Sequence, residues 1–540
     1  MAARSDATMK RLTLIACILG SGIALLDSTV VNVALPTIQR ALGGGLAAQQ
    51  WIANAYLLTL GSLILVGGSL GDVFGERRVF ELGVSAFGVA SLLCAVAPTV
   101  ETLIAARALQ GIAGALLTPS ALAVIVNTFP ESERGPAIGS WTAWGGIATV
   151  AGPLAGGELL AIASWRWIFV INVPLVVVCV ALVRIAIPPS ERRKADGRRI
   201  DVLGAGLCAL GLAGPVFALI EQPRLGWSSV GVIAPLLAGA ILLVAFVLFE
   251  SRARDPMLPM RLFRRRNFAA GNVETFSMYA GLSILFFFLT LFLQQVGRYS
   301  PLQAGLATLP ATVVMFALSR RFGALADRFG PRFFMGAGPL VAASGLMLLE
   351  RVGEPVHYVA DVLPGLLVFS LGLSMTVAPL TAAVLAGAEH EAGIASGVNN
   401  AVARVAGLLG TTAVGAAVAA SFISTLNARL AHSALGGAAR AAAQQAKHLP
   451  LGVPNVRGLP AAQAHALTRA AEAASLHSFR LSLAIAAALV AGGGLAGAIG
   501  VRNPGREVLA ESCPGGQLVG ASRHLGGGAR AGATVGAESG

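Results

Sequence analysis

The chain has few charged residues and lacks the short motifs that mark most enzymes. Only 12% of its 540 residues are Asp, Glu, Lys or Arg, whereas about a quarter of a typical soluble domain is charged. No GxxxxGK[ST] phosphate loop occurs, which argues against ATP as an energy source. No HExxH or CxxC pattern occurs, and no nucleophile-elbow pattern places an enzyme active site here. We therefore expect a protein that is not an enzyme and that uses no metal and no cofactor.

Cysteine is scarce as well. Four of the five cysteines, Cys17, Cys94, Cys179 and Cys208, stand inside apolar stretches, and the fifth is Cys513. Their spacing fits neither a disulfide framework nor a metal site. We interpret them as packing residues.

Apolar residues are abundant, making up 55% of the chain. A helix needs about 20 residues to cross the roughly 30 Å of hydrocarbon in a bilayer, and about fourteen apolar runs reach that length. The sequence therefore predicts an all-α, polytopic membrane protein. The expected spans lie near 12–34, 51–70, 79–97, 102–127, 137–161, 166–187, 201–220, 229–249, 268–294, 303–322, 333–350, 358–380, 393–421 and 480–501.

The positive charges explain the orientation that we expect. The formal net charge is +13, but the Arg residues cluster in short segments between apolar runs instead of forming one basic face. This arrangement follows the positive-inside rule and does not indicate a nucleic-acid partner. The segments 75–78, 191–199, 251–254, 261–266 and 319–332 are thus predicted to be cytoplasmic, as are both termini. The first apolar run continues without a cleavage site, so we expect a retained span and not a signal peptide.

One short pattern occurs twice. Residues 68–78 read GSLGDVFGERR and residues 323–333 read GALADRFGPRF, sharing Gly-x-Leu-x-Asp-x-Phe-Gly-x-Arg. Both copies follow a span and are predicted on the same side, at matching points of two halves, which favours two related bundles around a midplane site. We expect a six-helix bundle over 1–190, two inserted spans over 191–266 and a second six-helix bundle over 267–501. The second bundle is expected to include a long extracytoplasmic loop over 422–479, and residues 502–540 have the composition of a disordered cytoplasmic tail.

A few polar residues fall deep inside apolar runs. Arg107 lies within a span, where a charge is costly and indicates function, and Asp27 and Gln110 are its candidate partners. Snorkelling of Arg107 to the interface is the alternative. A carboxyl group removed from water can load and release a proton near neutral pH, so Asp27, followed by Asn32, is the main candidate for proton coupling. A structural acid held by hydrogen bonds is the alternative for Asp27, and Glu274 and Arg404 are further candidates.

Several of these stretches resemble one family. GSLGDVFGERR resembles the signature loop of the major facilitator superfamily, and LIAARALQGIAGA (103–115) resembles its fourth-helix pattern with a buried Arg. GGIATVAGPLAGG (145–157) resembles the Gly-Pro pattern in the fifth helix of its antiporters. LDSTVVNVALP (26–36), WRWIFVINVP (165–174) and the number of spans resemble the fourteen-span drug:proton antiporter branch. The resemblance covers about 1–501.

The resemblance implies a fold, an activity and roles for residues. It implies two six-helix bundles with two extra spans, and proton-coupled export of small apolar or cationic compounds by alternating access. The expected partners are these compounds, protons and the lipid bilayer, for a monomer in a bacterial-type inner membrane. The repeated loops would form a conformational latch, although a turn that only fixes topology is the alternative; its residues would be Gly68, Asp72, Gly75, Arg77, Arg78, Asp327, Gly330 and Arg332. The Gly-Pro motif, which would impede leakage, consists of Gly152, Pro153, Gly156 and Gly157.

Two other functions remain open at this point. One is a dedicated exporter of a single endogenous metabolite, such as an antibiotic or a siderophore. The other is a membrane sensor that has the same fold but transports nothing. The ionisable pair at Asp27 and Arg107 argues against the sensor.

Overall fold

The computed structural model describes residues 6–188, 200–386, 392–431, 433 and 435–503. Within these residues the chain is helical between short connections and contains no strand, which confirms the all-α prediction. Fourteen helical segments are long and apolar enough to cross a membrane. Residues 504–540, where we expected a disordered tail, and the basic segment 191–199 lie outside the described residues.

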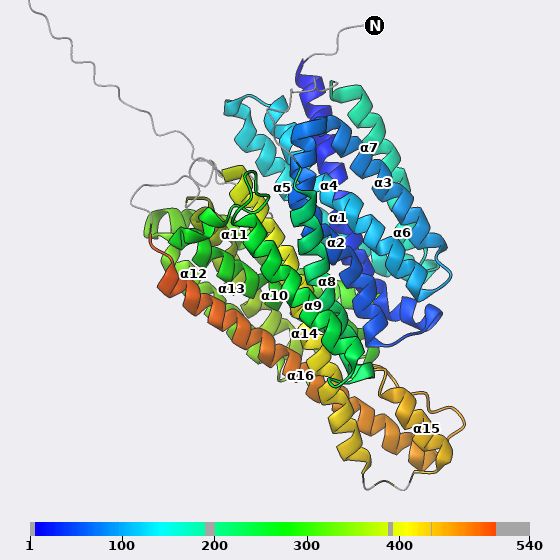
Figure 1. Cartoon of the computed structure of the whole chain (residues 1–540). Helices are drawn as coiled ribbons and strands as arrows, with labels where there is room; N and C mark the ends of the chain where they lie inside the picture. Colours follow the sequence, from blue (N-terminus) through cyan, green and yellow to red (C-terminus); the bar gives the residue numbers. More distant parts are fainter. Residues whose placement is uncertain (1–5, 189–199, 387–391, 432, 434, 504–540) are drawn as a thin grey trace, which may run out of the picture.

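The helices follow one another along the chain in two sets of six spans with a pair between them (Figure 1). The first half consists of α1 (Asp6–Leu42), α2 (Leu46–Phe74), α3 (Glu76–Val96), α4 (Val100–Thr128), α5 (Glu131–Ile162) and a sixth span made of α6 (Trp167–Val170) and α7 (Asn172–Ala186). The inserted pair is α8 (Val202–Leu225) and α9 (Val230–Glu250). After a 3-10 turn, η1 (Met260–Arg264), the second half consists of α10 (Arg266–Gln295), α11 (Pro301–Phe329), α12 (Pro331–Leu349), η2 (Tyr358–Val362) with α13 (Leu363–Ala386), α14 (Ala392–Leu430) and α16 (Ala461–Gly500), with α15 (Gly437–Ala446) before α16.

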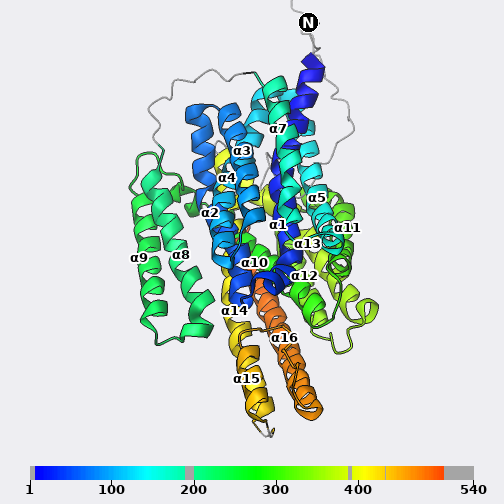
Figure 2. The ribbon, with the colours of Figure 1, turned by 90° about the vertical axis from the view of Figure 1, so that its right-hand side faces the viewer.

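The inserted pair lies beside the two bundles and not between them (Figure 2). α8 packs on α9 and also contacts α2 and α14, one helix from each half. The halves themselves meet through α1 with α10, α2 with α14 and α5 with α11. The six, two, six arrangement expected from the apolar runs is therefore the observed one.

The repeated motif lies at helix ends, and here the structure corrects one expectation. We expected Asp72 and Asp327 in loops, but they occupy the last turns of α2 and α11. The turns themselves are made by Gly75 and Gly330, whose φ angles are 91° and 84°. A helix continues until a residue takes such a left-handed conformation, which glycine adopts without steric cost. Each copy of the motif therefore separates two helices at the glycine that follows its Phe, Gly75 in the first copy and Gly330 in the second.

The long connection that we expected over 422–479, in either an amphipathic or an irregular form, is largely helical within the described residues. α14 continues to Leu430, α16 begins at Ala461 and α15 lies between them, so the three extend past the bundles as a helical projection (Figure 1). Phe422, Leu426 and Leu467 are fully buried in a small core of this projection. The segment is rich in alanine, the residue with the highest helix propensity, and its larger apolar residues cover one another.

The two halves are joined at one end of the molecule. We call the end that carries Gly75 and Gly330 the basic-loop end and the other the opposite end. Near the opposite end, Gln294 Nε2 of α10 donates to the Val33 carbonyl of α1 (2.9 Å), and Gln50 Nε2 of α2 donates to the Thr411 carbonyl of α14 (2.8 Å). One buried apolar cluster also includes residues of both halves there, such as Leu35 and Phe292. The halves are thus closely packed toward the opposite end.

Candidate functional site

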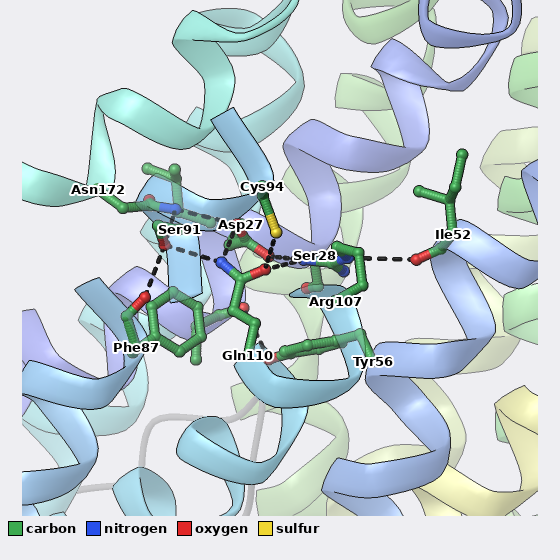
Figure 3. A network of polar contacts seen from close by, with 12 residues as sticks. Asp27, Ser28, Ile52, Tyr56, Phe87, Ser91, Cys94, Arg107, Gln110 and Asn172 are labelled. Carbon is green, nitrogen blue, oxygen red and sulfur yellow. Dashed lines mark hydrogen bonds and ion pairs between the residues drawn. The ribbon is translucent and has the colours of Figure 1, made fainter. Parts of the chain in front are cut away.

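A buried polar network lies in the middle of the first half (Figure 3). Asp27 comes from α1, Arg107 and Gln110 come from α4, and Asn172 is the first residue of α7. Asp27 is 0% exposed and Arg107 is 1% exposed. Three segments that are distant in sequence therefore bring a carboxylate, a guanidinium and two amides into one water-poor site.

The carboxylate of Asp27 has a complete set of donors. Oδ2 accepts from Arg107 Nη1 at 2.5 Å, and Oδ1 accepts from Gln110 Nε2 and from Asn172 Nδ2, both at 2.9 Å. Ser91 Oγ of α3 accepts from the same two amides at 2.9 and 3.3 Å and donates to the Phe87 carbonyl at 2.8 Å. Three hydrogen bonds, one of them from a cation, offset the cost of burying this polar group.

Arg107 connects this network to the middle of the molecule. Besides Asp27, it donates from Nη1 to Gln110 Oε1 (2.6 Å) and from Nε to the Ile52 carbonyl (3.2 Å). Its guanidinium lies over the Tyr56 ring, 4.4 Å from the ring centroid. Arg107 also lines the central cavity, whereas Asp27 is behind it. The guanidinium therefore lies between the buried carboxylate and the cavity.

The sequence anticipated part of this network. Asp27 and Gln110 were the candidate partners of Arg107, and both contact it. Asn172 and Ser91 were not expected in the site. Asn172 lies at the break between α6 and α7, which turns its side chain toward α1, and only the presence of an amide inside an apolar run signalled it.

The central cavity lies between the two halves and has a volume of about 320 Å³, which is within the range of small-molecule sites. Its first-half wall is rich in hydroxyl and amide groups, including Asn32. The second-half wall carries aromatic side chains and Arg404. The structure thus brings Asn32, Arg107 and Arg404 to one cavity.

Glu274 is placed elsewhere. It is 0% exposed within the second half, and a methyl group added at Gly497 of α16 would collide with its carboxyl group. Neither carboxyl oxygen has a hydrogen-bond partner among the described residues, and Glu274 does not line the cavity. Glu274 and Arg404 therefore form no ion pair in this conformation, and a charge at Glu274 would be uncompensated.

The Gly-Pro motif of α5 forms a close seam with two helices. A methyl group added at Gly152 would collide with Thr29 of α1, and one at Gly156 would lie 2.9 Å from Val30. One at Gly157 would lie 2.5 Å from Leu302 of α11, in the other half. The carbonyl of Pro153 in turn faces Gly305 of α11. Side chains other than hydrogen would separate these helices, so the seam depends on glycine.

The remaining latch candidates divide between the two repeats. In the first, Gly68 faces Pro119 of α4, Asp72 and Arg78 are exposed and Arg77 is half-buried. In the second, Arg332 Nε donates to the Ala498 carbonyl at 2.7 Å, which caps the end of α16 inside its own half.

The buried ion pair leads to a prediction on stability. Arg107→Gln leaves a buried carboxylate without its cation, and breaking a buried pair in this way costs about 3–5 kcal/mol. Asp27→Asn is milder, about 1–3 kcal/mol, because Arg107 still donates to Gln110 Oε1 and to the Ile52 carbonyl. The double variant is more stable than Arg107→Gln alone. Unfolding monitored with a thiol-reactive dye is suitable, since Cys17, Cys94 and Cys179 are buried.

The matched control is Arg184→Gln, which removes a pair to Glu81 whose Arg side chain is 67% exposed. Exposed pairs contribute about 0–1 kcal/mol, so this variant is near wild type. If Arg107→Gln were no less stable than Arg184→Gln, the buried pair would not be the main polar support of this bundle.

Comparisons with known proteins agree with this geometry. The family model for the Major Facilitator Superfamily matches residues 17–411. The puromycin resistance protein pur8 of Streptomyces alboniger is 39% identical over 393 residues, covering 72% of this chain and 78% of that protein. The tetracenomycin C resistance and export protein of Streptomyces glaucescens is 34% identical over 416 residues, covering 75% and 76%.

Among solved structures, a bacterial homologue of the human lysosomal transporter Spinster superposes with a TM-score of 0.63 at 17% identity, covering 92% of this chain and 99% of that one. That likeness supports the fold alone. Members of the matched family are transporters and not enzymes. The chain therefore belongs to the Major Facilitator Superfamily, and its fourteen candidate spans agree with the fourteen-span branch of that superfamily.

Proposed function

We propose that the protein is a proton-coupled antiporter that exports small organic compounds by alternating access across a bacterial inner membrane. The observation that carries this proposal is the Asp27–Arg107 pair directly behind the wall of the central cavity. The relatives are named for resistance to or export of puromycin and tetracenomycin C, which supports compounds of that size as cargo. We expect the protein to act as a monomer.

Proton coupling requires a group whose charge controls a contact with the cargo site. In this conformation Arg107 Nη1 donates to Asp27 Oδ2 at 2.5 Å. A proton that binds Asp27 neutralises the carboxylate and leaves the guanidinium free to move toward the cavity. Release of that proton restores the pair and withdraws Arg107. The guanidinium would thus enter the cavity when Asp27 holds a proton and leave room for cargo when it does not, so that proton binding and cargo binding oppose each other, as antiport demands.

The energetics are sufficient for efflux with one proton per cycle. A proton that enters along a membrane potential releases about 2.3 kcal/mol per 100 mV. A tenfold uphill gradient of cargo costs about 1.4 kcal/mol. A single carboxylate can therefore sustain substantial export.

Several relatives are named for a single compound, which favours a second candidate function. Puromycin, tetracenomycin C and methylenomycin A each appear in the name of one relative, whereas another relative is named a multidrug resistance protein. A dedicated exporter of one metabolite is therefore the alternative to multidrug efflux. Both use the same Asp27–Arg107 coupling.

The first test concerns coupling. A growth-inhibition panel with cells that express the chain, beginning with puromycin and tetracenomycin C, selects a transported compound. In proteoliposomes, the wild type accumulates this compound about tenfold more with an acidic lumen than without a gradient, whereas Asp27→Asn loses that stimulation because an amide releases no proton. The variant retains exchange of labelled for unlabelled compound, since binding remains.

Glu81→Gln is the matched control, because Glu81 also pairs with an arginine but is far more exposed than Asp27. This variant retains full stimulation. Gradient-driven accumulation by Asp27→Asn would move the coupling role to another residue, and Glu274 would be tested next.

The second test concerns orientation. We infer that the basic-loop end is cytoplasmic and that the structure is inward-facing, because the halves are joined toward the opposite end. In a background with Cys208→Ser and Cys513→Ser, an impermeant thiol reagent outside intact cells labels Gln463→Cys at the start of α16 and spares Ser251→Cys at the end of α9. The reverse labelling would overturn the orientation.

The third test concerns the latch. We infer that Asp72 makes a contact that exists in only one state, so that Asp72→Asn slows transport about tenfold, equivalent to about 1.4 kcal/mol of lost state-specific contact, at unchanged membrane expression. Asp327→Asn has a smaller effect, because Pro331 replaces Glu76 in the second copy and Arg332 caps α16 within its own half. Wild-type rates in both variants would reduce the motif to a turn that only fixes topology.

A further inference from the structure

The central cavity contains positive charge that nothing in the cavity balances. Arg107 and Arg404 line it, and no Asp or Glu is among its lining residues within the described part of the chain. The charge of Arg107 is already matched by Asp27, directly behind it. The uncompensated charge of the cavity therefore belongs to Arg404.

Arg404 lies at membrane depth on α14. It follows the start of that helix by about twelve residues, which is roughly 18 Å at 1.5 Å per residue. Gly407 and Thr411, three and seven residues later, line the same cavity, so this face of α14 is the cavity wall. The base of the side chain packs on Gly61 of α2, where an added Cβ would lie 3.3 Å from Arg404 Cβ.

The guanidinium of Arg404 has no partner within the described residues. Its Nε is buried without a hydrogen-bond acceptor, and no ion pair to it is seen in that part of the chain. The buried acid of the same half, Glu274, does not line the cavity. Snorkelling does not apply to a side chain that faces a central cavity. An unpaired cation at this depth is costly and indicates a functional site.

The surroundings of Arg404 show what kind of molecule would match it. Tyr56 and Tyr279 line the same cavity. Phe286 and Phe287 of α10 also line the cavity. Flat aromatic walls favour an aromatic body, and a guanidinium binds a carboxylate through two parallel hydrogen bonds.

We propose that Arg404 is the anchor for an acidic oxygen of the cargo, and that the preferred cargo is an aromatic compound with a carboxylate or phenolate group. The inference rests on the proposed export function and narrows its cargo class. It departs from the apolar or cationic cargo expected from the sequence, because a cationic compound in this cavity would meet Arg404 without a compensating acid. Arg404 is a specificity-determining residue and takes no part in proton transfer.

Binding without a proton gradient separates this inference from the proposed coupling. Purified protein in phosphatidylcholine nanodiscs is titrated with three fluorescent probes that share one ring system: 1-naphthaleneacetate, 1-naphthaleneethanol and 1-naphthylethylammonium. Empty nanodiscs correct for partition into lipid. The acetate binds tightest and the ammonium binds weakest. Arg404→Gln weakens binding of the acetate about tenfold, because it removes a charge-assisted pair, and leaves the alcohol within about twofold.

Two further variants complete the design. Arg404→Lys retains the charge without the planar fork and gives an intermediate loss. Arg351→Gln removes an exposed positive charge that does not line the cavity, and it retains the preference of the wild type. The inference is overturned if the ammonium binds tightest to the wild type, or if Arg404→Gln retains the preference for the acetate. Either result leaves the Asp27 coupling test unaffected, because no gradient is involved.

Discussion

The main constraint on the structure is one ion pair that is buried where almost no water can solvate it. Asp27 and Arg107 are both essentially unexposed, and a charge in such surroundings is tolerable only with a full set of partners. Gln110, Asn172 and Ser91 supply that set from three helices. The pair therefore ties α1, α3, α4 and α7 to one another. In the proposed mechanism the same pair also links a proton to the cavity, so that the stability of the first half and the coupling would depend on one cluster.

The glycine seams complement this rigid cluster. α5 contacts α1 and α11 through Gly152, Gly156 and Gly157, where any larger side chain would collide with the neighbouring helix. Such surfaces have no interdigitating side chains, so helices can meet closely in one state and separate in another without breaking polar bonds. Within the described residues, few polar contacts cross between the halves, and one of them is the hydrogen bond from Gln294 to the Val33 carbonyl. These contacts would have to break when the halves separate. Alternating access requires bundles that keep their internal packing and interfaces between helices that can separate.

Much of the fold could be predicted because the bilayer imposes simple rules on sequence. Length and hydropathy reveal the fourteen spans, and the cost of an isolated charge in lipid shows that Arg107 needs Asp27 or Gln110. The projection formed by α14, α15 and α16 was not predicted, because its alanine-rich segments lack the apolar length that identifies a span. The place of Asn172 in the network was not predicted, because the orientation of its side chain depends on the break after α6. The unpaired states of Glu274 and Arg404 depend on which helix faces the cavity, and hydropathy contains no information on helix rotation.

The charge of the cavity also affects the energetics of export. In a cell whose interior is negative, an anion that leaves moves along the potential and gains about 2.3 kcal/mol per 100 mV, whereas a cation that leaves pays the same amount. If Arg404 anchors an acidic cargo as proposed, the cavity would capture the class of compound for which the potential assists export. The same guanidinium would then have to release its anion at the opposite face. Because no acid among the described residues pairs with Arg404, that release would depend on the opening of the cavity at that face.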